Sequence, residues 1–215
     1  MTYRLILAGE SRSFMAGDPF LKSDDQARAL VIMGDGAGAA FARLDDIDAY
    51  DVVLIELGTE CLGVHTGESA GLEGGHILGF ARFRMGALPP TDLVEIVRQP
   101  NTTSTALETA KGIFHAAGLQ TAVCGDFPGR IIDRLVRPYY NAALNRLDAR
   151  LATAADMDLT LKLGLGHPKG PIELLQESGL AAHHDVTRAL YEALGDPAYH
   201  PARRAQVAAI QKSKD

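Results

Sequence analysis

The chain has 215 residues, 47% of them hydrophobic and 22% charged, which is the balance of a globular protein with a core for one or two domains. Its formal net charge is -6 without runs of like charge, so a nucleic-acid partner is not expected, because phosphate binding needs clustered Lys and Arg. No stretch approaches the ~18 apolar residues of a membrane span and the opening residues lack a signal-peptide pattern, so we expect a cytoplasmic protein without a membrane partner. The two cysteines, Cys61 and Cys124, are too few for a disulfide or zinc framework, and no metal is expected.

Five short apolar runs in the first hundred residues predict buried strands. They lie at residues 3–7, 29–33, 51–57, 76–80 and 93–97. Glycines close the first three runs, and continuous apolar residues are typical of strands that are covered on both faces of a parallel sheet. Residues 82–92 predict a loop, because Pro89 and Pro90 cannot donate hydrogen bonds to a neighbouring strand.

A helix and a sixth strand are expected next. Thr103 is a typical N-cap residue, and the apolar residues that follow keep helical spacing as far as Gly118. Residues 121–124 then predict a strand. A strand, a helix and a strand at this spacing form a crossover unit, so residues 1–126 are interpreted as an α/β domain.

The pattern is helical throughout residues 127–215, which are interpreted as a second, all-α domain. Apolar residues between 131 and 147 keep to one stripe, in which Pro138 predicts a kink without a break. Thr153, with Asp156 three residues later, indicates the cap of the next helix. Further helices are expected from about residues 171, 182 and 201. The boundary between the two domains is marked by a change in the spacing of apolar residues, from a strand pattern to a helix pattern, and not by a flexible linker.

Four segments resemble the 3-hydroxyacyl-CoA dehydrogenase family over about half to two-thirds of the chain. DFPGRIIDRLVRPYYNAAL (126–144) resembles the strand-to-helix entry of that family's C-terminal domain, and ATAADMDLTLKLGLGHPKGPIELLQESGL (152–180) is similar to its G-x-G-x-P-x-G-P-x-E-L-L signature. Residues 183–201 match the helix and turn that follow, and residues 93–123 resemble the end of the nucleotide domain. The resemblance implies a trimmed, Rossmann-like, mostly parallel sheet followed by a helical domain that contributes to dimerisation and borders an acyl-CoA cleft.

The G-x-G-x-x-G loop that opens this family lays a pyrophosphate of NAD on a helix N-terminus. The first predicted strand is not followed by the three glycines that this loop needs, but Gly34, Gly36 and Ala39 fit G-x-G-x-x-A after the second strand. The helix after them is expected to be short, Asp35 would repel a pyrophosphate, and Glu56 is the nearest approach to the acidic ribose partner. A plain glycine turn and a degraded NAD loop are the two interpretations.

The catalytic residues of the family are a His that takes the proton of the 3-hydroxyl group, a Glu that orients it, and a Ser and an Asn that bind the substrate oxygen. The resemblance places Ala81 at the His position, Glu95 at the Glu position and Asp133 at the Asn position. Ala cannot accept a proton, and Asp puts a negative charge where an amide should donate. The loss of a positioned base typically removes ~10²–10⁴ of rate, so the usual dehydrogenation is not expected.

Four other residues are candidates for the missing roles. Thr66 or Ser69 lies in the neighbourhood of the family's Ser, and His65 or His76 is a candidate substitute for the base. The other interpretation of these histidines is that they are solvated or hydrogen-bonded without a catalytic role. The His183–His184 pair falls outside the catalytic set, and we expect it to serve only the surface and the packing of its helix.

Three hypotheses on function remain open. The first is a degenerate family member with weak or no dehydrogenase activity, which binds acyl-CoA or serves as an accessory subunit in fatty-acid or aromatic-acid β-oxidation. The second is an active NAD-dependent 3-hydroxyacyl-CoA dehydrogenase that forms 3-oxoacyl-CoA. The third is a non-catalytic module that pairs with a larger dehydrogenase homologue. The expected partner is a second copy of the chain, in a homodimer through the helical domain, or a larger dehydrogenase homologue.

Overall fold

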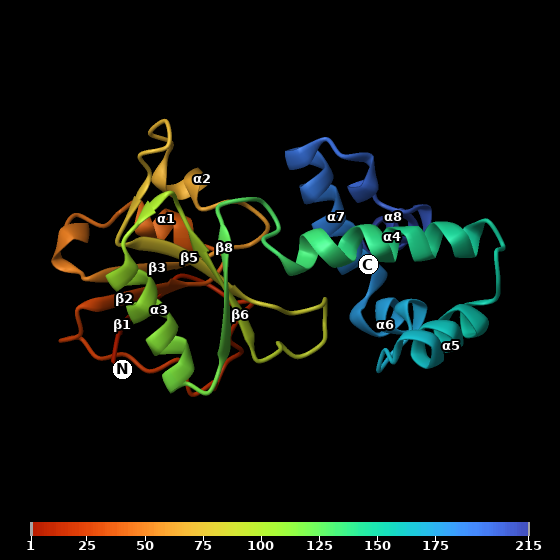
Figure 1. Ribbon diagram of the computed structural model, residues 1–215, viewed down its shortest axis with the longest axis horizontal. Coiled ribbons are helices and arrows are strands. Elements are labelled where there is room, and N and C mark those ends of the chain that lie inside the picture. Colours follow the sequence, from red (N-terminus) through yellow and green to blue (C-terminus); the bar gives the residue numbers. More distant parts are fainter. Residues whose placement is uncertain (1, 215) are drawn as a thin grey trace. The chain divides into compact units, whose positions relative to one another are not determined.

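The computed structural model describes residues 2–214, which form two compact units (Figure 1). The α/β unit runs to Arg84 and resumes from Pro90 to Ile131. The helical unit comprises the short segment Met85–Pro89 and the chain from Ile132 onward. Within residues 2–214, none of the helices combines the length and the apolar character that a membrane span requires.

The α/β unit contains a six-stranded, mostly parallel sheet, as the sequence predicts. Its strands, in their order across the sheet, are β1 (Arg4–Leu7), β2 (Ala29–Met33), β3 (Val52–Glu56), β5 (Ile77–Arg82), β6 (Leu93–Arg98) and β8 (Gln120–Gly125). The β5–β6 pair is antiparallel and the other four pairs are parallel. A dinucleotide-binding sheet reverses its strand order at the ligand crevice. Among the described residues, the strands of this sheet lie side by side in the same order as they occur along the chain, so the strand order does not reverse.

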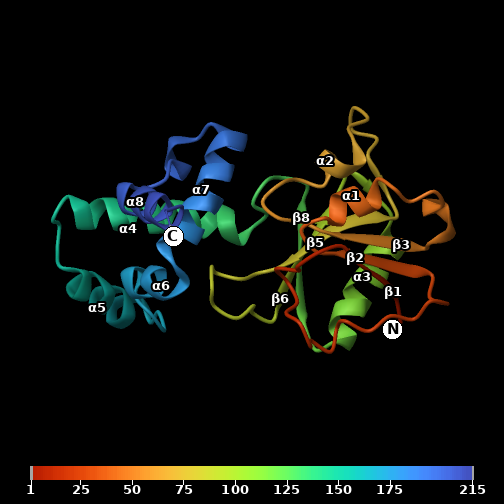
Figure 2. The same ribbon diagram turned by 180° about the vertical axis from the view of Figure 1, so that it is seen from behind.

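Both faces of this sheet are covered, which explains the continuous apolar runs in its central strands. All residues of β2 and β3 are buried, and alternate side chains enter different clusters. One cluster packs against α3 (Ser104–Ala116) and the other against α1 (Ala37–Phe41), so these helices lie on opposite faces (Figure 2). The smaller elements are the 3₁₀ turn η1 (Ile47–Ala49), α2 (Gly63–Thr66) and a second sheet of β4 (Gly74–Gly75) with β7 (Asn101–Thr102). The sequence analysis did not predict this second sheet.

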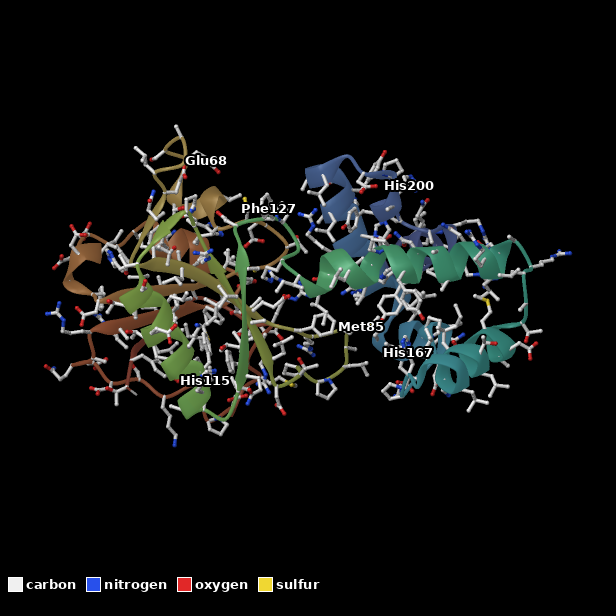
Figure 3. The ribbon with its side chains drawn as sticks, viewed as in Figure 1. Glu68, Met85, His115, Phe127, His167 and His200 are labelled. Carbon is white, nitrogen blue, oxygen red and sulfur yellow. The ribbon has the colours of Figure 1, made fainter. Side chains whose placement is uncertain are left out.

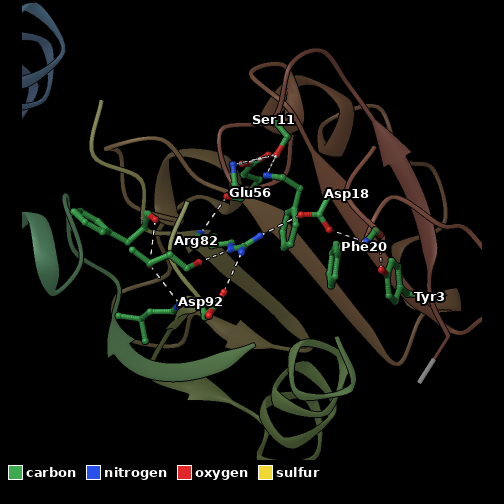
Figure 4. Close-up of polar contacts among 12 residues, drawn as sticks. Tyr3, Ser11, Asp18, Phe20, Glu56, Arg82 and Asp92 are labelled. Atoms are coloured by element: carbon green, nitrogen blue, oxygen red, sulfur yellow. Dashed lines mark hydrogen bonds and ion pairs between the residues drawn. The ribbon is translucent and has the colours of Figure 1, made fainter. Parts of the chain in front are cut away.

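The connection between β1 and β2 contains no helix, although parallel neighbours are usually joined by one. Two phenylalanines fill the space instead: the Phe14 and Phe20 rings stack at 4.1 Å, and Phe20 stacks on Phe114 of α3 at 5.5 Å. The segment is also held by polar contacts, including the ion pair between Arg82 and Asp18 at 3.2 Å (Figure 4). A compact aromatic segment therefore takes the place of a crossover helix.

The helical unit forms as expected. Its helices are α4 (Ile132–Asp148), α5 (Ala154–Leu165), α6 (Pro171–Ser178), α7 (Leu180–Leu194) and α8 (Arg203–Lys212), with the 3₁₀ turn η2 (Pro197–Tyr199) before the last. Pro138 lies inside α4, which continues beyond it. The predicted caps are confirmed: Thr103 accepts a hydrogen bond from the N–H of Ala106, and Thr153 accepts one from that of Asp156.

Candidate functional site

The two residues that the resemblance assigns to the family's Glu and His positions face each other across two strands. In the antiparallel β5–β6 pair, Ala81 lies directly opposite Glu95. Side chains of such a pair stand about 4.5–5.5 Å apart at Cβ, so an imidazole at position 81 would reach the Glu95 carboxylate. Both residues are buried, with exposed fractions of 5% and 1%. The pair therefore consists of a buried carboxylate and a buried methyl group.

The Glu95 carboxylate is bound by an arginine and a backbone amide. Arg130 Nε lies 3.3 Å from Glu95 Oε2, and the N–H of Ile131 donates to Oε1 at 3.0 Å. Arg130 Nη1 also donates to the carbonyl oxygen of Gly58 at 2.7 Å. The Arg130 and Glu95 side chains are 7% and 2% exposed, so this is a buried ion pair. A guanidinium that only donates and stays protonated cannot act as a general base.

The loop that follows β3 lies against the same turn. Besides the Gly58 contact, the carbonyl oxygen of Thr59 accepts a hydrogen bond from the N–H of Gly129 at 2.9 Å. The sequence analysis missed this loop, although residues at the carboxyl ends of parallel strands are the usual site residues of such sheets. Thr66 instead contacts the Gln99 amide at 2.9 Å, and the N–H of Ser69 donates to Glu73. The structure thus brings Gly58 and Thr59, and not Thr66 or Ser69, to the Arg130 turn.

Asp133, which the resemblance places at the family's Asn position, is also in a buried ion pair. It lies in the first turn of α4, and Arg137, one turn later, donates from Nε to Asp133 Oδ1 at 2.7 Å. Arg137 Nη1 lies 3.2 Å from Nδ1 of His183, and His183 Nε2 lies 3.0 Å from Oδ1 of Asn141. Because Arg137 can only donate, His183 accepts at Nδ1 and carries its proton on Nε2.

His183 is a buried, neutral histidine. It is 1% exposed, so the expectation of a surface position is wrong for this residue, whereas its packing role is supported by its contacts. Burial, reinforced by the positive charge of Arg137, lowers the pKa of His183 to about 3. The network therefore combines the Asp133–Arg137 ion pair with an imidazole that is neutral near pH 7.

Glu56, the nearest candidate for a ribose partner, is held by the protein itself. Its carboxylate accepts hydrogen bonds from the N–H of Gly34 at 2.7 Å and of Ser13 at 2.8 Å, and from the Ser11 hydroxyl group at 3.0 Å (Figure 4). The residue is 6% exposed. Glu56 therefore fixes the glycine loop to the segment that follows β1.

The glycines of the G-x-G-x-x-A pattern are required by contacts within the chain. A Cβ atom on Gly34, whose φ is +105°, would lie 2.5 Å from the carbonyl oxygen of Ala8, and one on Gly36 would lie 2.9 Å from it. A Cβ on Gly38 would lie 2.2 Å from the imidazole of His65. The helix that follows, α1, has five residues, and Ala39 within it is exposed. Close packing on Ala8 and His65 explains the glycines without a bound pyrophosphate.

Neither candidate histidine bonds Glu95 among the described contacts. His76 Nε2 lies 3.2 Å from the carbonyl oxygen of Ile47, which is a structural contact. His65 Nε2 lies 3.3 Å from Glu60 Oε1, and both residues line a cavity of about 200 Å³ at the carboxyl ends of the first strands. Burial of Glu60 opposes ionisation, but hydrogen bonds from the N–H of Gly58 and from His65 outweigh it and lower the pKa of Glu60.

A second cavity, mostly apolar and of about 480 Å³, lies in the helical unit. It is lined by Val136, Tyr139, Tyr140, His167, Pro168, Lys169, Pro171 and Leu174. His167 belongs to the corner between α5 and α6 (Figure 3), and this corner is rigid because Asp158 accepts hydrogen bonds from the N–H groups of Ile172 and Glu173. Lys169 pairs with Glu177. No cluster of three or more metal-ligating side chains occurs within residues 2–214.

The fold defines the class: a Rossmann-like, mostly parallel sheet is joined to a helical domain. Residues 129–212 match the family model described as 3-hydroxyacyl-CoA dehydrogenase, C-terminal domain. Residues 129–212 therefore form a C-terminal domain of the 3-hydroxyacyl-CoA dehydrogenase family.

Curated relatives agree with this assignment. The chain is 34% identical to a 3-hydroxybutyryl-CoA dehydrogenase of Bradyrhizobium diazoefficiens over 117 residues, which are 54% of this chain and 40% of the relative. It is 37% identical to the human mitochondrial hydroxyacyl-coenzyme A dehydrogenase over 93 residues, which are 43% of this chain and 30% of that protein. The chain thus matches less than half the length of these relatives.

Solved structures show the same fold. The (S)-3-hydroxybutyryl-CoA dehydrogenase PaaH1 from Ralstonia eutropha superposes with a TM-score of 0.71 at 22% identity, over 86% of this chain and 66% of that one. A 3-hydroxybutyryl-CoA dehydrogenase from Escherichia coli K12 gives a TM-score of 0.73 at 23% identity, over 87% of this chain and 40% of that one. At these identities the likeness establishes the fold and not the activity.

Proposed function

We propose that this family member binds acyl-CoA thioesters, as an accessory component of fatty-acid or aromatic-acid β-oxidation, and does not carry out the dehydrogenation of its relatives at ordinary enzyme rates. The observation that carries the proposal is the state of Glu95. It lies opposite Ala81 and is bound by Arg130. A general base needs a side chain that accepts a proton near neutral pH, and neither methyl nor guanidinium does so.

The proposal extends to the cofactor. The strand order contains no reversal, which is the feature that opens a dinucleotide crevice in related sheets. The glycines of the candidate loop pack on Ala8 and His65, and Glu56 already accepts three hydrogen bonds. These contacts do not fit a pyrophosphate and a ribose, so no step through NAD is assigned to these residues.

Acyl binding is supported by the cavity in the helical unit. Its walls are mainly side chains of Tyr, Pro, Val and Leu, and a volume of about 480 Å³ accommodates a medium-length acyl group. Burial of such a chain contributes about 0.8 kcal/mol per methylene group. The α5–α6 corner, which the Asp158 hydrogen bonds hold in place, supplies part of the wall of this cavity.

A homodimer through the helical unit is part of the proposal. No residue of α5 is buried, and Leu159 and Leu163, one turn apart, are 53% and 79% exposed. Leu151, before α5, and Leu165, its last residue, are exposed as well. Sedimentation of the purified chain should show a dimer that Leu163→Glu dissociates, with Leu72→Glu, an equally exposed leucine of the α/β unit, as the control. A monomer that co-purifies with a longer dehydrogenase would favour the pairing module instead.

The decisive experiment is a parallel calorimetric titration with acetoacetyl-CoA and with NADH, combined with an oxidation assay on 3-hydroxybutyryl-CoA and NAD. We expect the thioester to bind, NADH not to bind, and no turnover above background. A full-length 3-hydroxybutyryl-CoA dehydrogenase serves as the positive control. Turnover of about 1 s⁻¹ or more, the ordinary range for enzymes, would refute the proposal.

One observation favours a second candidate, an active NAD-dependent 3-hydroxyacyl-CoA dehydrogenase with a relocated base. His65 and Glu60 form a histidine–carboxylate pair beside a cavity at the carboxyl ends of the strands. In this case the oxidation assay should give turnover that His65→Ala abolishes. His76→Ala should leave it unchanged, because His76 contacts only a backbone carbonyl among its described hydrogen bonds.

A further inference from the structure

One cavity of the α/β unit is lined by charges of both signs. It has a volume of about 330 Å³ and lies between the loop after α2, the end of β6 and the residues after β8. Its lining residues are Glu68, Glu73, Arg98, Gln99, Pro100, Gly125, Asp126 and Phe127 (Glu68 and Phe127 are labelled in Figure 3). The cavity therefore combines three carboxylates, one guanidinium group and an aromatic ring.

Two of the carboxylates approach the same point. A Cβ atom on Gly63 would lie 2.7 Å from Glu68 Oε1 and 3.4 Å from Asp126 Oδ2. Asp126 is stabilised by hydrogen bonds from the N–H groups of Leu62 and Gly63. The exposed Glu68 side chain has neither a hydrogen bond nor an ion pair among the described residues. Its carboxylate is therefore available to a cationic group, and the charge of Asp126 beside it strengthens the attraction.

Arg98 lines the same cavity and pairs with none of these carboxylates. The residue is exposed, and its side chain has no ion pair among the described residues. A guanidinium group stays protonated and presents its N–H donors in a fork that matches a carboxylate. Opposite charges that border one cavity without contacting each other are complementary to a ligand that carries both signs.

Gln99 adds a nearly buried acceptor to this cavity. It is 3% exposed, and its Nε2 donates to Thr66 Oγ1 at 2.9 Å and to Asp126 Oδ2 at 3.0 Å, which fixes the orientation of the amide. Its Oε1 accepts no hydrogen bond among the described residues. The Tyr139 hydroxyl group is the one fully enclosed side-chain oxygen or nitrogen atom without a partner in this part of the chain, so Gln99 Oε1 keeps access to solvent. Such an oxygen is suited to an N–H donor of a ligand.

We propose that this cavity binds a free α-amino acid with a large apolar side chain. The ammonium group of the ligand contacts the Glu68 carboxylate and Gln99 Oε1, and its carboxylate contacts Arg98. Its side chain lies against Pro100 and the Phe127 ring, which is 60% exposed. A volume of about 330 Å³ accommodates a ligand of this size. The proposal is independent of acyl-CoA binding.

The experiment follows the backbone amide signals of the isotope-labelled full chain by NMR. The chain is titrated with L-phenylalanine and with two analogues that each lack one charge, phenethylamine and 3-phenylpropionate. We expect phenylalanine to shift the signals of Gln99, Gly125 and Phe127. Each analogue should bind about tenfold more weakly or worse, because it loses the charge-assisted hydrogen bonds of one group.

Two variants assign the charges of the site. Arg98→Met should remove the preference for phenylalanine over phenethylamine, and Glu68→Gln should remove the preference over 3-phenylpropionate. Arg43→Met and Glu108→Gln make the same changes at exposed positions outside the cavity lining and should keep both preferences. All four positions are exposed, so the thermal unfolding midpoints should stay near that of the unmodified chain, which checks folding.

Three outcomes would overturn the proposal. The first is the absence of shifts at these amides up to about 10 mM phenylalanine, well above the concentration at which a weak specific site fills. The second is equal binding of phenylalanine and either analogue by the unmodified chain, since the cavity would then read one charge or neither. The third is a pair of preferences that survives both Arg98→Met and Glu68→Gln.

Discussion

The buried pair of Glu95 and Arg130 makes a stability prediction that can be tested with a double-mutant cycle. Both side chains are almost fully enclosed, so either one left alone is a desolvated charge without a counterion. Removal of one partner of such a pair typically costs about 3–5 kcal/mol. We therefore expect Glu95→Gln and Arg130→Met each to lower the free energy of unfolding by roughly this amount.

Glutamine is the informative replacement at position 95, because its side-chain oxygen can still accept the hydrogen bond from the N–H of Ile131. The double variant removes both charges, so its loss should be clearly smaller than the sum of the two single losses, by about 2 kcal/mol or more. Urea unfolding followed by circular dichroism measures all four proteins. Amide exchange of β6 reports on the α/β unit separately, because two units need not unfold together.

The matched control is Arg28→Met, which breaks an ion pair whose side chains are 68% and 57% exposed. A pair this open to solvent should contribute less than about 1 kcal/mol. If Glu95→Gln and Arg130→Met cost no more than this control, or if their effects add, the Glu95 carboxylate is not enclosed with the guanidinium. The argument that it is unable to serve a catalytic histidine would then fail.

Three further predictions follow from the site contacts. The pKa of His183 is about 3 in the folded chain and ~6.5 in the unfolded chain, so the unfolded state binds a proton first as the pH falls. Between pH 7 and pH 5 the folded state should therefore lose about 2 kcal/mol of stability. Urea midpoints at both pH values should show this loss, and His183→Gln should remove most of it. Gly38→Ala should destabilise the α/β unit by about 1–3 kcal/mol, since its Cβ would overlap the His65 imidazole, and a second change, His65→Ala, should restore the melting temperature. Gly34→Ala should destabilise as much or more, and His65→Ala should not rescue it, because Gly34 combines a positive φ with a clash against the backbone of Ala8.

Much of the fold could be predicted because its signals are local. The apolar runs that became β2 and β3 need no knowledge of distant residues, and the caps at Thr103 and Thr153 act within one helical turn. The order of strands is a different kind of information. The order depends on which strand edges pair with each other. The pairing of β1 with β2, which no crossover helix joins, produces no recognisable sequence pattern within either strand.

The candidate site was predicted only in part, for the same reason. The resemblance placed Ala81 and Glu95 at two family positions, and the strand register then put them opposite each other. The partner of Glu95 could not be found this way, because Arg130 lies 35 residues away in sequence. The burial of His183 was missed because its environment is made by Arg137 and Asn141 on another helix.

The two carboxylates that the resemblance places at catalytic positions of the family are held in the same way. In the α/β unit the Glu95 carboxylate lacks an imidazole and has Arg130, and in the helical unit Asp133 stands where the family has an amide and has Arg137 one turn later. A carboxylate buried without a counterion is unstable, so the arginine beside each of these two carboxylates stabilises it in the core. Restoring a single family residue, such as Asn at position 133, would leave an arginine buried without its partner. Each carboxylate is therefore expected to tolerate substitution only together with its arginine.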